Sequence, residues 1–106
     1  MTERAEAATA PGTVLVRYWA AARAAAGVDS DTVPVPEPLP LSRVLADVLA
    51  LHSDRPRLKD VVGVCSILIG EQPVGARDLD EVLVRAGDTV ELLPPFAGGS
   101  AQPPVG

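Results

Sequence analysis

The sequence contains little cysteine and little positive charge, and it has no long apolar run. Cys65 is the only cysteine, so no disulfide can form within the chain, and a reducing compartment is expected. Nine Lys and Arg against fourteen Asp and Glu give a net charge of −5, which disfavours nucleic acid and anionic membranes as partners because both require basic patches. No segment approaches the roughly eighteen apolar residues of a membrane-spanning helix. Residues 1–12 also lack the basic and apolar regions of a secretory signal, so a cytoplasmic protein is predicted.

The composition predicts one small globular domain. Of the 106 residues, 47% are hydrophobic and 22% are charged, a balance that suits a single core. Residues 1–12 are polar and rich in alanine, and residues 100–106 are small and contain prolines, so both ends are expected to be disordered. The folded domain is therefore predicted over residues 13–99.

The domain is predicted to begin with a strand and a short helical turn. Residues 13–19 alternate between two faces, as a strand does. The inward face would consist of Val14, Val16 and Tyr18. Residues 20–26 are strong helix formers, and Gly27 stands where a left-handed residue would end the turn.

The middle of the chain contains the one clear helical pattern. Residues 31–36 predict an edge strand, because prolines cannot donate ladder hydrogen bonds, and residues 36–40 predict an extended connector. Residues 41–53 predict a helix in which Arg43 and Asp47 can pair. Its apolar stripe would consist of Val44, Leu45, Val48 and Leu49.

The second half is predicted to supply the remaining strands. Residues 54–63 predict a polar connector, and residues 64–69 predict a strand buried on both faces. Residues 77–86 predict one turn of 3₁₀ or α-helix, and a last strand follows. Since parallel strands need a helical crossover and only residues 41–53 offer one, the fold class is α+β, a mixed sheet with one main helix across it.

The candidate functional site is the sequence DTVELLPPFAGG at residues 88–99. Its first half predicts a strand, and Pro94 and Pro95 end the ladder and favour an extended exit. From Pro94 to Gly99 an extended chain spans about 20 Å, at about 3.3 Å per residue. A stiff exit, the apolar Phe96 and a bare diglycine could enter a narrow channel in a partner. The alternative interpretation is a terminal strand followed by a flexible linker.

Other residues give weaker signals. Cys65 lies in an apolar run, which favours packing over a redox role. His52 ends the predicted helix and has no second metal ligand near it in sequence, so no metal site is predicted. Trp19 is expected to pack or to contact a partner. A solvated face is expected for the acidic residues Asp78, Asp80, Glu81 and Asp88.

Three segments together resemble the MoaD/ThiS-type sulfur carriers, a ubiquitin-like β-grasp family that includes molybdopterin synthase small subunits. Residues 16–27 (VRYWAAARAAAG) resemble the family's first strand and arginine-bearing turn, and residues 45–55 (LADVLALHSDR) resemble its main helix. Residues 88–99 resemble its last strand and Pro-Pro-x-x-Gly-Gly ending. The resemblance implies a β-grasp domain over residues 13–99 and a carrier rather than an enzyme.

The resemblance also implies the chemistry of the site. The carboxylate of Gly99, with Gly98 beside it, would be adenylated by a partner enzyme that resembles ubiquitin-activating enzymes and uses ATP; the carrier itself would bind no cofactor or metal. Sulfide would then displace AMP, and the resulting thiocarboxylate would donate sulfur for molybdopterin or another metabolite. Glycines let the backbone enter a water-poor site without side-chain clashes. Contacts with the partners are expected from Pro94, Pro95, Phe96 and Ala97.

The chain departs from the family pattern because Gly99 is not terminal. Its carbonyl belongs to an amide, so residues 100–106 would first have to be removed, as a metalloprotease does for some relatives. The expected clients are a pterin synthase large subunit or a cysteine synthase. Two alternatives remain, a ubiquitin-like modifier attached through Gly99 and a non-carrier interaction domain.

Overall fold

The computed structural model describes residues 11–95, and every structural statement below concerns these residues. Residues 1–10 of the expected leader and residues 96–106 lie outside the described part, so what the sequence predicts for them remains a prediction. Gly12 accepts a hydrogen bond from the Val35 N–H (2.8 Å), so the chain joins the sheet at this residue. The described elements follow in the order β1 (Thr13–Tyr18), α1 (Ala20–Ala26), β2 (Ser30–Pro34), β3 (Leu39–Pro40), α2 (Leu41–Leu51), α3 (Pro56–Val62), β4 (Ser66–Ile69), β5 (Gln72–Pro73), β6 (Leu83–Val84) and β7 (Thr89–Leu93).

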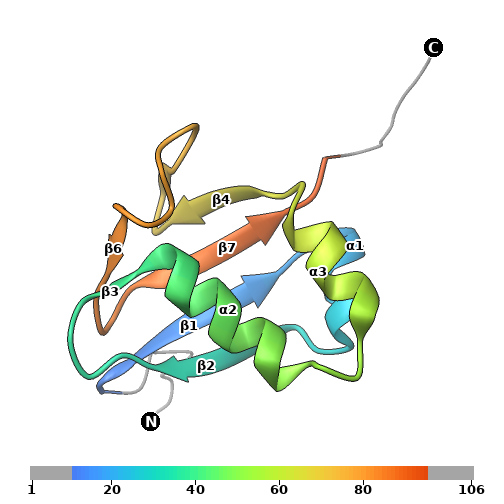
Figure 1. Ribbon diagram of the computed structural model, residues 1–106, viewed down its shortest axis with the longest axis horizontal. Helices are drawn as coiled ribbons and strands as arrows, with labels where there is room; N and C mark the ends of the chain where they lie inside the picture. Colours follow the sequence, from blue (N-terminus) through green and yellow to red (C-terminus); the bar gives the residue numbers. More distant parts are fainter. Residues whose placement is uncertain (1–10, 96–106) are drawn as a thin grey trace, which may run out of the picture.

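The main sheet is mixed and has the strand order β2-β1-β7-β4-β5. Strands β1 and β7 run parallel, and the other neighbours in this sheet are antiparallel. Helix α2 crosses one face of the sheet, while α1 and α3 lie side by side beyond the end toward which β1 and β7 point (Figure 1). The predicted α+β class, with a mixed sheet and one main helix across it, is confirmed.

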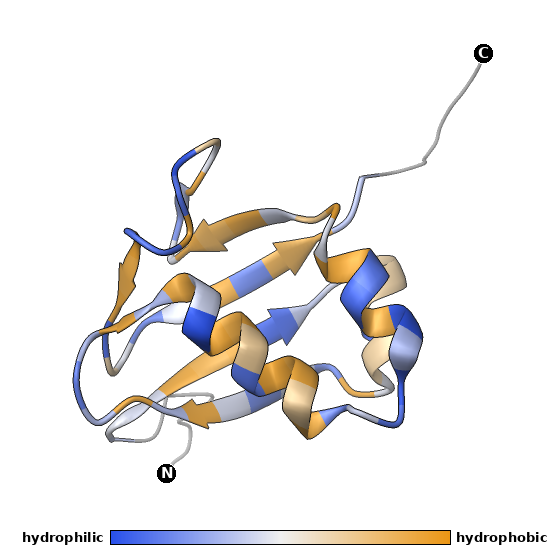
Figure 2. Ribbon diagram, in the orientation of Figure 1, coloured by the Kyte–Doolittle hydropathy of each residue, from blue (hydrophilic) through white to orange (hydrophobic). Residues whose placement is uncertain are grey.

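The core lies between α2 and the sheet, and it follows the alternation predicted for the strands. Figure 2 shows β1 and β7 as mostly apolar strands, each with one strongly hydrophilic position. The inward side chains of these two strands are Val14, Val16, Tyr18, Val90 and Leu92, all buried. The predicted edge strand is also found, with β2 at the edge of the sheet and both Val33 and Val35 buried.

Helix α2 has the apolar face that the sequence predicts. Val44, Leu45 and Val48 are buried, and Leu49 packs half-buried against the same core. Arg43 Nε lies 3.3 Å from Asp47 Oδ1, the predicted pair four residues apart. The helix ends at Leu51, slightly earlier than expected.

The first helical turn is confirmed at its predicted bounds. Helix α1 spans Ala20–Ala26, and Gly27 follows with φ +80°, in the left-handed region that favours glycine. The Gly27 N–H donates to the Arg23 carbonyl (2.8 Å), which closes the last turn.

The connector predicted over residues 54–63 is wrong, because most of it is helix α3 (Pro56–Val62). Pro56 occupies the first turn, where a missing N–H costs nothing and the fixed φ suits a helix. Leu58 and Val62, four residues apart, are buried on one face. The polar residues around Pro56 led to the prediction of a connector, although proline at this position begins a helix.

One predicted strand also needs correction. Residues 64–69 are not buried on both faces: Val64 is 61% exposed, β4 begins at Ser66, and Cys65, Ile67 and Ile69 are half-buried. In the described part of the chain the helices cover only one face of the sheet (Figure 1), and the β4 side chains are exposed or half-buried.

A second sheet was missed. Residues 36–40 were expected to be only a connector, and residues 77–86 one helical turn. Instead Leu39–Pro40 (β3) pairs antiparallel with Leu83–Val84 (β6), after a tight turn in which the Glu81 N–H donates to the Asp78 carbonyl (2.9 Å). Strands of two residues carry no readable alternation, so the sequence pattern could not show them.

Candidate functional site

The site begins where β7 leaves the sheet. The strand is held on both sides to its end, because Leu93 pairs with Ser66 of β4 and the Trp19 N–H donates to the Leu92 carbonyl (3.2 Å). The two residues that follow differ in exposure, since Pro94 is buried and Pro95 is exposed. Pro94 therefore fixes the base of the exit in the fold, and Pro95 is the last described residue before Phe96.

Only two of the six site residues predicted from the sequence lie in the described part of the chain. Pro94 and Pro95 lie at the end of a central strand, at the same end of the molecule as α1 and α3 (Figure 1). Phe96, Ala97, Gly98 and Gly99 lie outside the described residues. The roles predicted for all six residues therefore remain predictions. The structure describes the end of β7 and the two prolines that lead to the other four residues.

A polar cluster lies beside the last residues of β7, on the face of the sheet away from α2. The Trp19 indole N–H donates to Glu91 Oε1 (2.9 Å), and the Arg17 guanidinium carbon lies 4.7 Å from the centre of the Trp19 ring. Arg17 Nη1 is also 4.0 Å from Glu91 Oε1. These contacts hold the 40% exposed Trp19 in one orientation near the exit, where it is available to a partner.

His52 has a partner that the sequence did not reveal. Its Nε2 lies 2.5 Å from Asp31 Oδ2, and the Tyr18 hydroxyl donates to the same oxygen (2.7 Å). Burial, and then the hydrogen bond and negative charge of Asp31, raise the pKa of Tyr18 well above its usual range. The cluster ties β1 and β2 to the end of α2. Within residues 11–95 no three His, Cys, Asp or Glu side chains gather as metal ligands.

Cys65 lies beside a groove of about 540 Å³ formed by α2, α3, β4 and the turn after β5. Its side chain is half-buried, and burial raises the pKa of the thiol to about 11. A protonated thiol is a poor nucleophile at neutral pH, which agrees with the packing role predicted for this residue.

The raised pKa predicts slow alkylation of Cys65. A pKa of about 11 instead of 9.0 leaves the thiolate about a hundredfold less populated at pH 8. Iodoacetamide should therefore label the folded chain about a hundredfold more slowly than the chain unfolded in urea. The rate should rise tenfold for each pH unit until about pH 11. Intact-protein mass spectrometry measures both rates, and equal rates at pH 8 would contradict the burial of the thiol.

No protein-family model matches the chain. Individual curated proteins, however, are similar to it over most of its length. The molybdopterin synthase sulfur carrier subunit of Chlamydomonas reinhardtii is 30% identical over 86 residues, which cover 81% of this chain and 98% of that protein. The same subunit of Aspergillus niger is 31% identical over 88 residues, which cover 82% of this chain and 94% of that protein.

Solved structures give the same fold. Small archaeal modifier protein 1 from Methanosarcina acetivorans superposes with a TM-score of 0.64 and 25% identity, over 84% of this chain and 98% of that one. A chain from the solved complex of subunits 1 and 2 of the molybdopterin-converting factor from Helicobacter pylori superposes with a TM-score of 0.55 and 23% identity. The match covers 82% of this chain and 99% of that one.

The sheet order, the crossing helix and these neighbours define a ubiquitin-like β-grasp protein, as predicted. The chain belongs to the family of molybdopterin synthase sulfur carrier subunits. Its role is therefore that of a carrier subunit and not of a catalyst. No helix in the described residues has the length and apolar character needed to cross a bilayer.

Proposed function

We propose that the chain carries sulfur as a thiocarboxylate on Gly99 after residues 100–106 are removed. One observation carries the proposal: β7 is a central strand of the sheet that ends at Leu93, and Pro94 and Pro95 follow it two residues before the diglycine of a chain from the sulfur carrier family. A strand held on both sides supplies a rigid base. The short segment beyond Pro95 can then be presented to an enzyme without unfolding the domain.

The proposed chemistry takes place in three steps, which are hydrolysis, adenylation and displacement by sulfide. Water first hydrolyses the Gly99–Ser100 amide, which gives a Gly99 carboxylate and a free peptide amine. The carboxylate then attacks the α-phosphorus of ATP in a partner enzyme, and pyrophosphate leaves. Finally sulfide attacks the acyl carbon, AMP leaves, and the thiocarboxylate remains. An acyl adenylate must be shielded from water until sulfur arrives, and a glycine backbone can enter a closed site that does this.

The proposed partners follow from these steps. A protease, expected to be a metalloprotease, opens the Gly99–Ser100 bond, and an adenylating enzyme activates the new carboxylate. The client is proposed to be a pterin synthase large subunit, since the Helicobacter pylori neighbour was solved as a complex of subunits 1 and 2 of the molybdopterin-converting factor. A cysteine synthase is the alternative client.

A ubiquitin-like modifier is the second candidate, because the Methanosarcina acetivorans neighbour at 25% identity is a small archaeal modifier protein. A modifier uses the same Gly99 acyl group, but a lysine amine displaces AMP instead of sulfide. The product is then an isopeptide bond to another protein. The two candidates therefore share the trimming and adenylation steps and differ in the nucleophile.

The test combines a chain ending at Gly99 with ATP, sulfide and the adenylating enzyme encoded in its own genome. We expect a mass gain equal to the exchange of one oxygen for one sulfur. Intact-protein mass spectrometry measures it, and omission of ATP is the control. Attachment to lysines of added proteins, with no sulfur gain, would favour the modifier. Absence of both products with every adenylating enzyme of that genome would leave an interaction domain as the better interpretation.

A further inference from the structure

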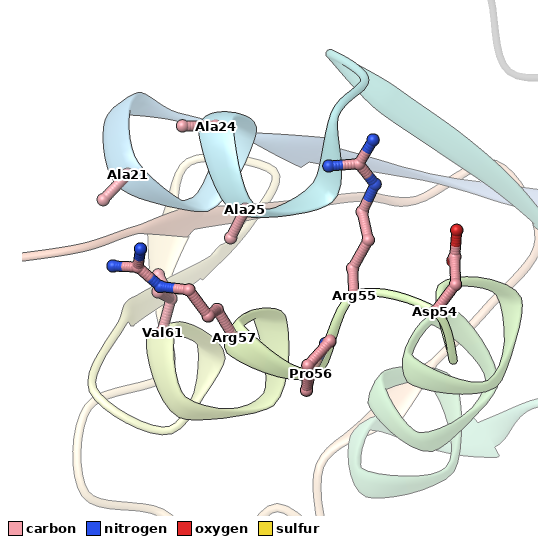
Figure 3. Close-up of a pocket in the computed structure, with 8 residues that line it drawn as sticks. All are labelled: Ala21, Ala24, Ala25, Asp54, Arg55, Pro56, Arg57 and Val61. Carbon is pink, nitrogen blue, oxygen red and sulfur yellow. The ribbon is translucent and has the colours of Figure 1, made fainter.

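A second surface lies at the end of the molecule from which β7 exits. It is a groove of about 400 Å³ between α1 and α3, which we call the arginine groove. Its lining residues are Ala21, Ala24, Ala25, Asp54, Arg55, Pro56, Arg57 and Val61. One wall consists of alanine methyl groups of α1, and the other consists of the residues that begin α3 (Figure 3). The groove is therefore apolar along its length and carries two cations.

The two arginines point to opposite ends of the arginine groove. Figure 3 shows the Arg55 side chain rising beside the last turn of α1, while the Arg57 side chain extends toward Val61. Arg55 is held in place by close packing on Gly27: a Cβ added at Gly27 would lie 2.5 Å from the Arg55 guanidinium carbon. The left-handed glycine that ends α1 therefore also makes room for this guanidinium.

Arg55 and Arg57 lack ion pairs within residues 11–95, as Arg77 and Arg85 also do, but they are the two that line one groove together. Three other arginines do have acidic neighbours: Arg17 lies near Glu91, Arg23 pairs with Asp29, and Arg43 pairs with Asp47. Arg55 and Arg57 have no salt bridge and no side-chain hydrogen bond in the described part of the chain. Asp54, on the rim, is the one carboxylate that lines the groove.

The positive charge of Arg55 and Arg57 stands out because the chain as a whole is negatively charged. A net charge of −5 repels acidic partners in general, so an acidic segment finds few places to dock. Two unpaired guanidinium groups around an apolar floor offer such a place, because guanidinium forms charge-assisted hydrogen bonds with carboxylates. Solvated arginines are common on surfaces, but these two border a groove at the end of the molecule where β7 leaves the sheet.

We infer that the arginine groove docks an acidic segment of the adenylating enzyme, with carboxylates on Arg55 and Arg57 and a small apolar side chain against the α1 alanines. The inference rests on the proposed function for the identity of the partner. It places a second contact beside the exit of β7, so the enzyme would hold the domain while the diglycine enters its active site.

The first test uses the full chain and a defined probe. Hexaglutamate is titrated into the ¹⁵N-labelled protein at low salt, with hexaglutamine and inorganic phosphate as controls. Amide shifts should concentrate in α1 and α3 and be lost in the double variant Arg55→Glu, Arg57→Glu. They should persist in Arg85→Glu, an exposed arginine at the far end of the sheet, before β7. Scattered shifts, or equal shifts with phosphate, would overturn the inference.

The second test measures adenylation of the chain ending at Gly99. The double variant should raise KM about tenfold with kcat unchanged, the order expected when two exposed charge contacts are reversed, and Arg85→Glu should match the wild type. The neutral variant Arg55→Gln, Arg57→Gln should fall between them, and thermal melts confirm that each variant folds. A KM equal to that of the control would overturn the inference while the carrier function stands. A wild-type chain that is never adenylated would instead refute the carrier function, and the peptide titration would still decide what the groove binds.

Discussion

The full-length chain should acquire no sulfur under conditions that convert the chain ending at Gly99 completely. In the full-length chain the Gly99 carbonyl is part of an amide with Ser100, so it has no carboxylate oxygen to attack ATP. Amide nitrogen is also a poor leaving group, which leaves sulfide no route without prior hydrolysis. The effect is all or none, and intact-protein mass spectrometry of both lengths, incubated side by side, measures it.

Two controls make this result specific to the diglycine. Treatment of the full-length chain with a protease that removes residues 100–106 should restore the reaction. A trimmed chain that carries Gly99→Val should remain unreacted, because a branched side chain beside the acyl carbon cannot enter a channel shaped for bare backbone. Sulfur found on the untrimmed chain would place the chemistry elsewhere in the protein. Reaction of the valine variant at the wild-type rate would refute the narrow channel.

Much of the fold was predictable because the long elements repeat their pattern several times. The alternation of β1 and the stripe of α2 each place several apolar residues on one face, and both faces are buried as predicted. Gly27 was predictable for a local reason, since a helix of alanines needs a residue that tolerates a left-handed conformation at its end. These signals do not depend on distant parts of the chain.

The errors occurred where a short segment depends on a distant one. Strand β3 exists only because Val84 and Leu83 come to Leu39 and Pro40 from far along the chain. His52 likewise meets Asp31 only after α2 crosses the sheet. Helix α3 could have been predicted, because a proline in the first turn followed by apolar residues four apart is a helix signal.

In the candidate site, too, local features were predictable from the sequence and features that depend on distant contacts were not. The order of strand, paired proline and diglycine is local, so the exit at Pro94 and Pro95 was predictable. That Pro94 is buried while Pro95 is exposed depends on its neighbours in space, and the sequence could not show it. The arginine groove was also not predictable, because it requires α1 and α3 to lie together and α3 was assigned to a connector.

Leu58→Ala should destabilise the domain by about 2–5 kcal/mol, the range for a buried leucine that leaves a cavity. Leu58 is fully buried, with 0% of its surface exposed, and it is the residue of α3 most deeply set in the core. A seven-residue helix has little stability of its own, so its position depends on this contact. Urea denaturation followed by circular dichroism gives the free energy of unfolding, and the slope m should stay unchanged if only stability is lost.

Leu51→Ala is the matched control, since the same atoms are removed from a side chain that is 57% exposed. Its free energy of unfolding should change by less than about 0.5 kcal/mol, as is usual for surface sites. Equal midpoints for the two variants would mean that α3 does not pack against the core.

Because α3 forms one wall of the arginine groove, a loosened α3 should also spread the Arg57 guanidinium away from α1. Leu58→Ala should then weaken hexaglutamate binding at urea concentrations where the chain is still folded, whereas Leu51→Ala should not.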